Sequence, residues 1–241
     1  MNDKTTFDRY PLLLRIARYL MLHGSFCDSL GLLTGKTGIA IFFYHYARYT
    51  GKRIYNDFAG ELIEEIYKEI NVNTPLNFKD GLCGIAWCIE YLIQNGFVDA
   101  DPDEVLEDLD KRIMEWDVRR ITDYSLETGL AGIACYVISR IENREKEHAI
   151  IRPDYICNLI EALKRKKENV DPALMDAMEY IESRHCEERS DKAIYSYNPV
   201  FEIVDKIRYN AKTVFDKSKS LGIDKAGHAG IGLLLMEINK Q

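Results

Sequence analysis

Gly35-Lys36-Thr37-Gly38-Ile39-Ala40 decides the fold of this chain, because close copies of it return three times. The copies are Gly81-Leu82-Cys83-Gly84-Ile85-Ala86, Gly129-Leu130-Ala131-Gly132-Ile133-Ala134 and Gly227-His228-Ala229-Gly230-Ile231-Gly232. Their first glycines lie 46, 48 and then 98 residues apart. Because 98 is two periods of 49, a degenerate fifth copy is expected at residues 171–187. Such self-similarity predicts an array of repeated structural units.

Two kinds of segment alternate along the array. Each motif opens an almost wholly apolar run, at residues 39–47, 85–93, 133–138 and 231–236. A run without a polar face is typical of a helix buried on all sides, although a buried strand would look similar over so short a length. The segments between these runs carry one apolar stripe and are otherwise charged, which predicts surface helices. With an early helix at roughly 8–23, we expect five inner (apolar) and five outer (striped) helices.

The prolines fall where this alternation predicts the starts of helices. The five that fall at the first turn of a proposed helix are Pro11, Pro102, Pro153, Pro172 and Pro199. Asp101, Asp171 and Asn198 precede three of them as natural N-caps. No Pro/Gly/Ser-rich linker divides the chain, so residues 1–241 are predicted to form a single all-α domain of about five helical hairpins.

Composition narrows the class of protein. The 32 basic and 39 acidic residues give a net charge of −7, which argues against nucleic-acid binding. The basic run Lys164–Lys167 is expected at the end of a surface helix. Met1–Arg9 does not resemble a signal peptide, and the apolar runs are too short to span a membrane. The six cysteines follow no disulfide-framework spacing, so we expect reduced thiols and a cytoplasmic location.

The glycine motifs suggest both an architectural role and a binding role. Glycine permits positive φ in the preceding loop and close approach between helix ends. The structural glycines predicted in this way are Gly35, Gly38, Gly81, Gly84, Gly129, Gly132, Gly227 and Gly230. The motifs are also expected to leave unpaired N–H groups at the helix N-termini, where the helix dipoles favour anions or carbonyl oxygens.

The tandem Gly-x-x-Gly-Ile-Ala copies, each opening the inner helix of a hairpin about 48 residues long, resemble the lanthionine synthetase C family. These enzymes close thioether rings in ribosomally made peptides. The resemblance covers roughly residues 30–240. It implies an α/α toroid, with inner helices around a central cavity. The family's full form has seven hairpins and five are counted here, so the chain is expected to be a shortened version that closes a smaller ring or leaves one open.

The family's chemistry needs a zinc ion held by two cysteines and a histidine, in a Trp-Cys-x-Gly element and a later Cys-His-Gly element. Neither element is complete here. In Trp87-Cys88-Ile89-Glu90, Glu90 stands in the glycine's place, and His185-Cys186-Glu187 has the reverse order without a glycine. His228 occupies a variable position of its motif. The resemblance therefore transfers no zinc ligand, and no cofactor is expected.

Two alternatives stay open at this point. Cys83 and His228 lie between the glycines of their motifs and could approach each other in a closed ring, as unusual zinc ligands of an active cyclase. Asp80, Asp123 and Glu127 precede motifs, as the carboxylates of an α/α-toroid glycoside hydrolase would. We favour a zinc-free protein that binds a peptide or a partner protein, with self-association covering helices that the shortened array leaves exposed. The predicted binding residues at the cavity mouth are Lys36, Asp80, Cys83, Asp123, Glu127 and His228.

Overall fold

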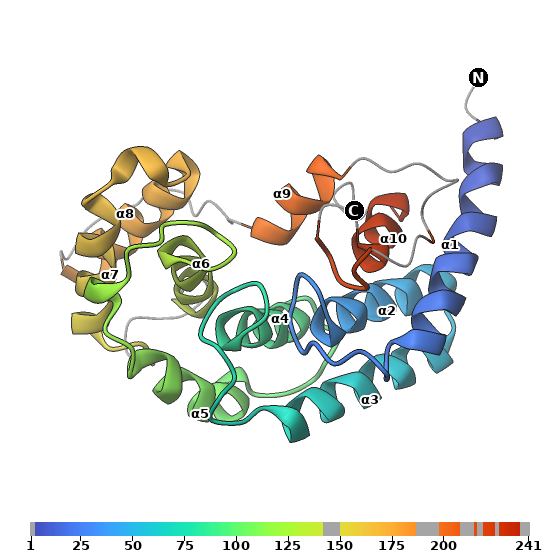
Figure 1. Cartoon of the computed structure of the whole chain (residues 1–241), viewed down its shortest axis with the longest axis horizontal. Coiled ribbons are helices and arrows are strands. Elements are labelled where there is room, and N and C mark those ends of the chain that lie inside the picture. Colours follow the sequence, from blue (N-terminus) through green and yellow to red (C-terminus); the bar gives the residue numbers. More distant parts are fainter. Residues whose placement is uncertain are drawn as a thin grey trace. The chain divides into compact units, whose positions relative to one another are not determined.

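The computed structural model describes residues 3–141, 150–186, 198–207, 215, 219–224 and 227–236. Within these residues, side chains are described except at 3–9, 183–186, 200 and 201. All the regular elements of the described residues are helices (Figure 1). The predicted all-α class is therefore confirmed.

The helices alternate as the repeats predict. The inner helices are α2 (Lys36–Thr50), α4 (Leu82–Gln94), α6 (Leu130–Ile141), α8 (Pro172–Cys186) and α10 (His228–Leu235). The outer helices are α1 (Asp3–His23), α3 (Arg53–Glu69), α5 (Pro102–Met114), α7 (Pro153–Lys164) and α9 (Pro199–Lys206). Short 3-10 turns follow α5 at Val118–Arg120 and α7 at Lys167–Asn169. The degenerate copy at 171–187 is the helix α8, so the fifth hairpin is confirmed, and the hairpins are of the α/α-toroid type.

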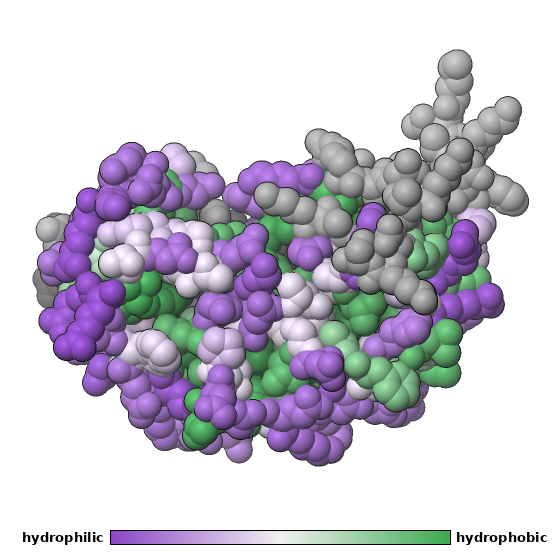
Figure 2. All heavy atoms as spheres, viewed as in Figure 1, coloured by the Kyte–Doolittle hydropathy of each residue, from purple (hydrophilic) through white to green (hydrophobic). Residues whose placement is uncertain are grey.

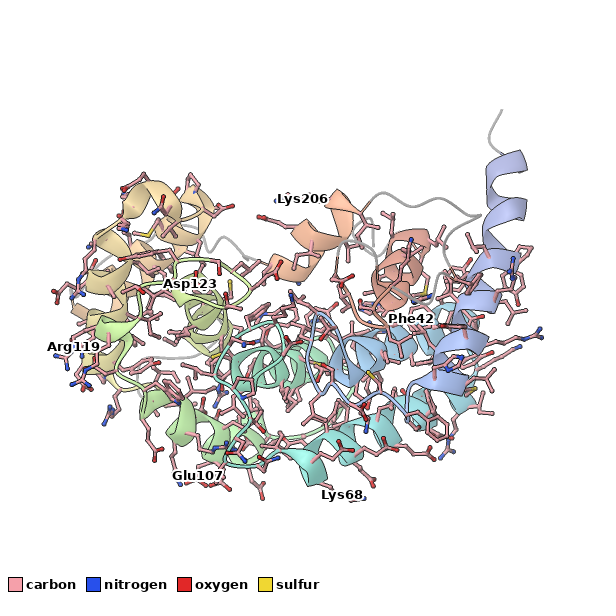
Figure 3. All side chains as sticks on the ribbon, in the orientation of Figure 1. Phe42, Lys68, Glu107, Arg119, Asp123 and Lys206 are labelled. Atoms are coloured by element: carbon pink, nitrogen blue, oxygen red, sulfur yellow. The ribbon has the colours of Figure 1, made fainter. Side chains whose placement is uncertain are left out.

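Burial separates the two kinds of helix. Every residue of α2 from Lys36 to Ala47 is buried, and so is every residue of α4 from Leu82 to Leu92. In α3, by contrast, only Ala59, Leu62 and Ile66 are buried. Hydrophilic residues predominate along the lower edge of Figure 2, where α3 and α5 lie, and Lys68 and Glu107 point away from these helices in Figure 3. The apolar and striped patterns were thus correct indicators of inner and outer helices.

The helix starts show which caps act as predicted. The Asp101 carboxylate accepts a hydrogen bond from the Asp103 N–H at 2.9 Å, and Asp171 accepts one from Ala173 N–H at 2.9 Å. Pro11 corrects the expected start of the first helix. Because α1 already begins at Asp3, Pro11 lies inside the helix and removes one of its N–H donors. Of the striped segment expected before the fourth motif, the structure describes α9 and Phe215, and residues 208–214 lie outside the described part.

The chain forms two compact units, each described here by itself. The first unit comprises residues 1–74 and 199–241, and the second comprises residues 75–198. The prediction of a single domain stays a prediction. In the first unit, α2 packs against α3, and α10 packs against α1, α2 and α9. In the second unit, α4 packs against α5 and α6, while α8 packs against α6 and α7.

The basic run expected on the surface is paired with acidic side chains of α8. Lys164 Nζ lies 2.7 Å from Glu182 Oε2, and Lys167 Nζ lies 2.8 Å from Glu179 Oε1. The run therefore serves as one side of an exposed ion-paired seam. Among the helices of the described residues, none combines the length and apolar character needed to cross a membrane.

Candidate binding site at the glycine-motif loops

Each glycine motif is held by the loop that precedes it. The N–H of the residue after the first glycine donates to a carbonyl seven residues earlier, from Lys36 to Ser29 (2.9 Å), from Leu82 to Pro75 (2.8 Å) and from Leu130 to Asp123 (2.9 Å). The fourth copy has one more residue in the loop, and His228 N–H donates to the Ser220 carbonyl at 3.1 Å. The loop therefore caps the inner helix with its own backbone.

This arrangement explains the glycines and corrects the predicted reason for them. A Cβ atom on Gly35, Gly81 or Gly129 would lie 2.0 to 2.3 Å from the carbonyl oxygen six residues earlier. The first glycines of the motifs are not at positive φ: the angle is −137° at Gly35, −124° at Gly81 and −70° at Gly227. Close approach of the helix's own loop, rather than left-handed backbone, requires glycine here.

The predicted unpaired N–H groups are also corrected. The amides of the first helical turn already donate to loop carbonyls, as shown further by Thr37 to Leu30 (3.2 Å) and Cys83 to Leu76 (3.1 Å). A ligand at these helix starts would have to displace an internal hydrogen bond. Recognition at this end must therefore come from side chains.

Lys36, a predicted binding residue, is buried in the first unit. Its Nζ lies 2.6 Å from Glu69 Oε1 and 3.1 Å from Glu65 Oε2, both on α3. Burial alone would lower the pKa of Lys36, but the hydrogen bonds and charges of Glu69 and Glu65 hold it above the usual value. Lys36 thus fastens an inner helix to an outer one, and its charge is already matched.

His228 is also in the first unit, stacked on Tyr19 of α1 with ring centroids 4.6 Å apart. Its Nδ1 lies 2.8 Å from the Ser220 carbonyl oxygen, so Nδ1 carries the proton. Burial lowers the pKa of His228, which keeps the ring neutral. The buried Nε2 has no hydrogen-bond partner among the described residues. His228 is a buried packing residue with one unused acceptor.

Four predicted residues belong to the second unit, where the loops before α4 and α6 are joined. Lys79 N–H donates to the Glu127 carbonyl at 2.9 Å, and the Lys79 ammonium lies 3.0 Å from the Glu127 carboxylate. This pair brings Asp80, next to Lys79, close to the loop that carries Asp123 and Glu127. All three acids are at least partly exposed. We call these three side chains the acidic rim, and the binding role predicted for them stays a prediction.

The chemistry of that rim does not suit a glycosidase. The hydrogen bond from Thr128, followed by the one from the Ser125 N–H, lowers the pKa of Asp123 below its ordinary value. A general acid needs a raised carboxyl pKa instead. Glu127 is already paired with Lys79. Asp123 is therefore suited to binding a cation rather than to donating a proton.

The cysteines of the second unit are buried thiols. Cys83 and Cys88 have no exposed surface, and burial raises the pKa of both thiols far above the usual value. Without a metal ion, these surroundings favour the protonated thiols, and the absence of zinc stays a prediction. Cys83 and His228 belong to different units. The described residues contain no group of three or more His, Cys, Asp or Glu side chains that could hold a metal ion.

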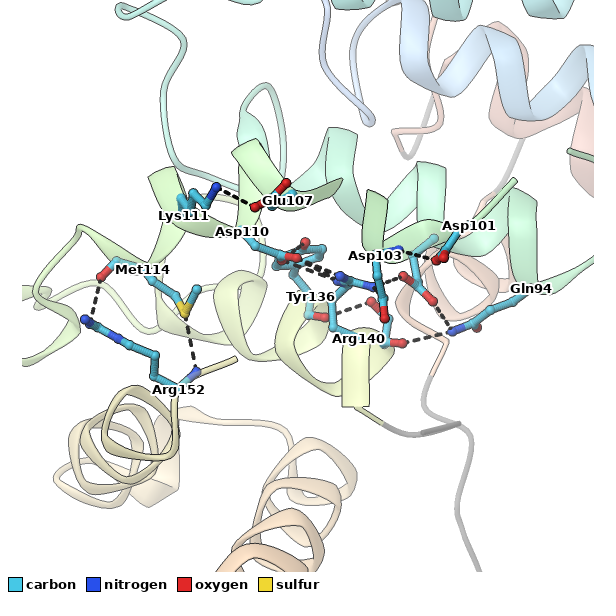
Figure 4. A network of polar contacts seen from close by, with 12 residues as sticks. Gln94, Asp101, Asp103, Glu107, Asp110, Lys111, Met114, Tyr136, Arg140 and Arg152 are labelled. Carbon is cyan, nitrogen blue, oxygen red and sulfur yellow. Dashed lines mark hydrogen bonds and ion pairs between the residues drawn. The ribbon is translucent and has the colours of Figure 1, made fainter. Parts of the chain in front are cut away.

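A buried charge network accounts for Glu90, the residue in the place of the family's glycine. Arg140 of α6 lies 2.7 Å from Glu90 Oε2 and 2.6 Å from Asp110 Oδ2, and Tyr136 donates a hydrogen bond to Asp110 (Figure 4). Glu90 also accepts a hydrogen bond from Gln94 at 2.9 Å. Sequence reasoning missed this network. Its signal was the presence of Glu90 and Arg140 within otherwise apolar helices.

Comparison with known proteins agrees with this architecture. A search of curated proteins finds no match. The family model described as "Lanthionine synthetase C-like protein" matches residues 27–198, which is more than half of the chain. The matched region contains three of the four glycine motifs and the helices from α2 to α8. The chain therefore belongs to the lanthionine synthetase C-like family.

Proposed function

We propose that this protein is a zinc-free member of its family that binds a peptide or partner protein in the modification of ribosomally made peptides. The observation that carries the proposal is the fate of the Trp87-Cys88-Ile89-Glu90 stretch. Cys88 is a buried neutral thiol, and Glu90 is held by Arg140 in a buried ion pair. A zinc ion at this place would need a thiolate and a position open to substrate.

Binding is supported by the loops that the repeat preserves. Two of them are fastened to each other by Lys79 and Glu127, and both present acidic side chains to solvent. Sites on such supported loops combine a rigid backbone with variable side chains. We also place the protein in the cytoplasm, where the thiols of Cys83, Cys88 and Cys135 would stay reduced.

The metal half of the proposal is tested by elemental analysis of the purified protein together with a thiol assay. The expected result is far less than one zinc per chain, and no loss of free thiol from a model peptide that contains cysteine and dehydroalanine. One tightly held zinc per chain, lost in Cys83→Ala or Cys88→Ala, would identify an active cyclase with unusual ligands and overturn the proposal.

The binding half is tested with synthetic, fluorescently labelled peptides encoded by genes beside this one. At least one should raise its fluorescence anisotropy on titration with the protein. A partner encoded there should instead co-elute with the protein. If no such peptide or protein binds, the binding role is rejected.

A further inference from the structure

The segment that follows α5 in the second unit exposes a tryptophan. Trp116 is 53% exposed, whereas Trp87, the other tryptophan of the chain, is buried in α4. The Trp116 N–H donates to the Ile113 carbonyl oxygen at 3.3 Å, and the 3-10 turn Val118–Arg120 follows directly. Hydrogen bonds of the backbone therefore hold the exposed indole in place.

One carboxylate ties two arginines to the same turn. Asp117, the residue after Trp116, accepts hydrogen bonds from Arg119 Nε at 2.8 Å and from Arg119 Nη2 at 3.1 Å. The Nε atom of Arg120 lies 3.4 Å from the other oxygen of Asp117. The Asp117 side chain also accepts the Arg119 N–H at 3.2 Å, and Arg119 points outward from the second unit in Figure 3. Trp116, Arg119 and Arg120 thus belong to one turn, joined by the side chain of Asp117.

The two ends of α7 hold this segment in place. Arg152, before α7, donates to the Met114 carbonyl at 3.4 Å (Figure 4), and Arg165, after α7, donates to the Arg119 carbonyl at 2.9 Å. The twelve residues of α7 span about 18 Å. The five-residue step from Met114 to Arg119 reaches at most about 17 Å, so this segment has to run along α7. Its two anchors make it one continuous surface. We call Trp116, Arg119, Arg120 and Arg165 the tryptophan–arginine strip.

Cations outnumber carboxylates in the tryptophan–arginine strip. Its three guanidinium groups share two carboxylates, those of Asp117 and Glu161, and Glu161 lies 3.5 Å from Arg165. The next charges along the chain, the exposed Lys166 and Glu115, cancel each other. Exposed ion pairs at such distances are weak, so the guanidinium groups keep donors for a further acceptor. The strip therefore favours a partner that brings a negative charge.

We infer that the tryptophan–arginine strip binds a peptide segment in which an aspartate or glutamate stands next to a large apolar side chain. This inference rests on the proposed function and specifies the class of peptide. The apolar side chain would lie against Trp116, and the carboxylate would accept hydrogen bonds from Arg120 and Arg165. Tryptophan and arginine are among the side chains that most often dominate the binding energy of an interface. A second copy of the chain fits less well, because pairing the strip with itself would bring arginines together.

The tryptophans allow binding to be located as well as measured. Trp87 is only 3% exposed, so acrylamide should quench mainly the fluorescence of Trp116. The acidic probe is a synthetic peptide of leucine, glutamate and serine, and the basic probe has lysine at each glutamate position. The acidic probe should protect Trp116 from acrylamide, less so as salt is added, while the basic probe should not protect it.

Variants are compared by the anisotropy of the acidic probe labelled with fluorescein. Trp116→Ala/Arg120→Glu should weaken its binding about tenfold or more. The matched control is Tyr49→Ala/Arg53→Glu in the first unit. Tyr49 is 47% exposed, and Arg53, like Arg120, is almost fully exposed with a carboxylate 3.4 Å away. The control should bind the acidic probe like the unaltered protein, and melting curves should show that both double variants are folded.

Several results would overturn the inference. These are no binding of the acidic probe, equal binding of the two probes, binding that leaves Trp116 unprotected, and unchanged binding by Trp116→Ala/Arg120→Glu. Single-stranded DNA that protects Trp116 and binds more tightly than the acidic probe would also overturn it. So would self-association, seen by light scattering, that this double variant abolishes.

These outcomes are separable from those of the proposed function. If a peptide encoded beside the gene binds but neither protects Trp116 nor responds to Trp116→Ala/Arg120→Glu, the protein binds peptides at another surface and only this inference fails. If no encoded peptide or protein binds at all, the proposed function fails, whatever the acidic probe does.

Discussion

The two units place different chemistry at the same position of the repeat. Eleven residues after the first glycine of its motif, α2 of the first unit has Tyr46 and α6 of the second has Arg140, and each is 1% exposed. Tyr46 lies among aromatic rings, 4.6 Å from Tyr55 and 5.5 Å from Phe42 between centroids. Arg140 lies among the carboxylates of Glu90 and Asp110. One backbone design thus accepts either a ring or a charge at its core.

This difference between an aromatic core and a charged core predicts how well each tolerates substitution. Aromatic packing is a sum of many small contacts, so a smaller apolar side chain loses only part of it. A buried ion pair has no such gradation, because removal of one partner leaves the other charged and desolvated. The second unit should therefore be much less tolerant than the first at this repeat position.

The largest expected effect breaks the network. Arg140→Leu leaves Glu90 and Asp110 buried without their cation and should lower the free energy of unfolding by about 3–5 kcal/mol. Tyr46→Leu, the matched change in the first unit, should cost only about 1–2 kcal/mol. Urea unfolding followed by circular dichroism compares the two, and hydrogen exchange locates the loss in α4–α6. Equal losses for the two variants would show that the charge network has no special cost.

A neutralised variant separates charge from packing. Glu90→Gln and Asp110→Asn, added to Arg140→Leu, remove the buried charges that the single change leaves behind. Part of the lost stability should return, since the desolvation penalty of the carboxylates disappears. No recovery at all would instead assign the loss to the cavity.

The second expected effect is a loss of stability at low pH that arises from two buried histidines of the first unit. Burial lowers the pKa of His45 to about 4 and also lowers that of His228, so the fold holds both rings neutral. The contribution of the histidines to stability should be fully present above pH 6.5, about the pKa of histidine in the unfolded chain. It should fall as the pH drops toward about 4, because in this range the unfolded chain binds protons that the folded protein does not. The loss due to His45 should be at most about 3 kcal/mol.

The measurement is the free energy of unfolding across this pH range for the unaltered protein and for His45→Gln. The variant should show a shallower slope. A slope that His45→Gln leaves unchanged would contradict the assignment to this ring.

The third effect tests what the two units share. A Cβ atom on Gly38 would lie 2.3 Å from the Leu32 carbonyl oxygen, and one on Gly132 would lie 2.4 Å from that of Leu126. Gly38→Ala and Gly132→Ala should each cost about 1–3 kcal/mol, because backbone must shift. Gly60→Ala is the control. With only the Tyr44 hydroxyl at 3.9 Å, it should be neutral or stabilising by up to about 1 kcal/mol. In thermal melts, Gly38→Ala and Gly132→Ala should both lower the melting temperature, and Gly60→Ala should not.

The sequence predicted the helices better than the contacts between them. The interval between glycines, the apolar runs and the prolines locate α2 to α10 because these signals are local and repeated. The carbonyl groups of the preceding loop that lie against each motif glycine could not be predicted, because a backbone hydrogen bond does not require any particular type of residue. From the sequence, Lys36 was expected at an open cavity mouth. In the structure its ammonium is paired with the carboxylates of Glu65 and Glu69, which belong to another helix.

The charge network was hidden for a related reason. Glu90, Asp110 and Arg140 come from three helices, and Asp110 stands in a striped outer helix where acids are ordinary. Only a charge inside an apolar inner helix could have signalled a buried partner. Pairing such residues requires knowing which helices are neighbours, and that information is in the fold rather than in any single segment.

The smallest effect is expected from the exposed ion pair that also joins two repeats in the second unit. Lys79 and Glu127 are 34% and 51% exposed, so water screens the pair, and the backbone hydrogen bond from Lys79 N–H to the Glu127 carbonyl survives any side-chain change. A double-mutant cycle of Lys79→Ala and Glu127→Ala should give a coupling energy below about 1 kcal/mol that shrinks with added salt. The same cycle on Arg140 and Glu90 should give several times more and respond little to salt, because that pair is dry. If the exposed pair couples as strongly as the buried one, burial is not what distinguishes the two links, and the contrast between a charged core and a charged surface would have to be abandoned.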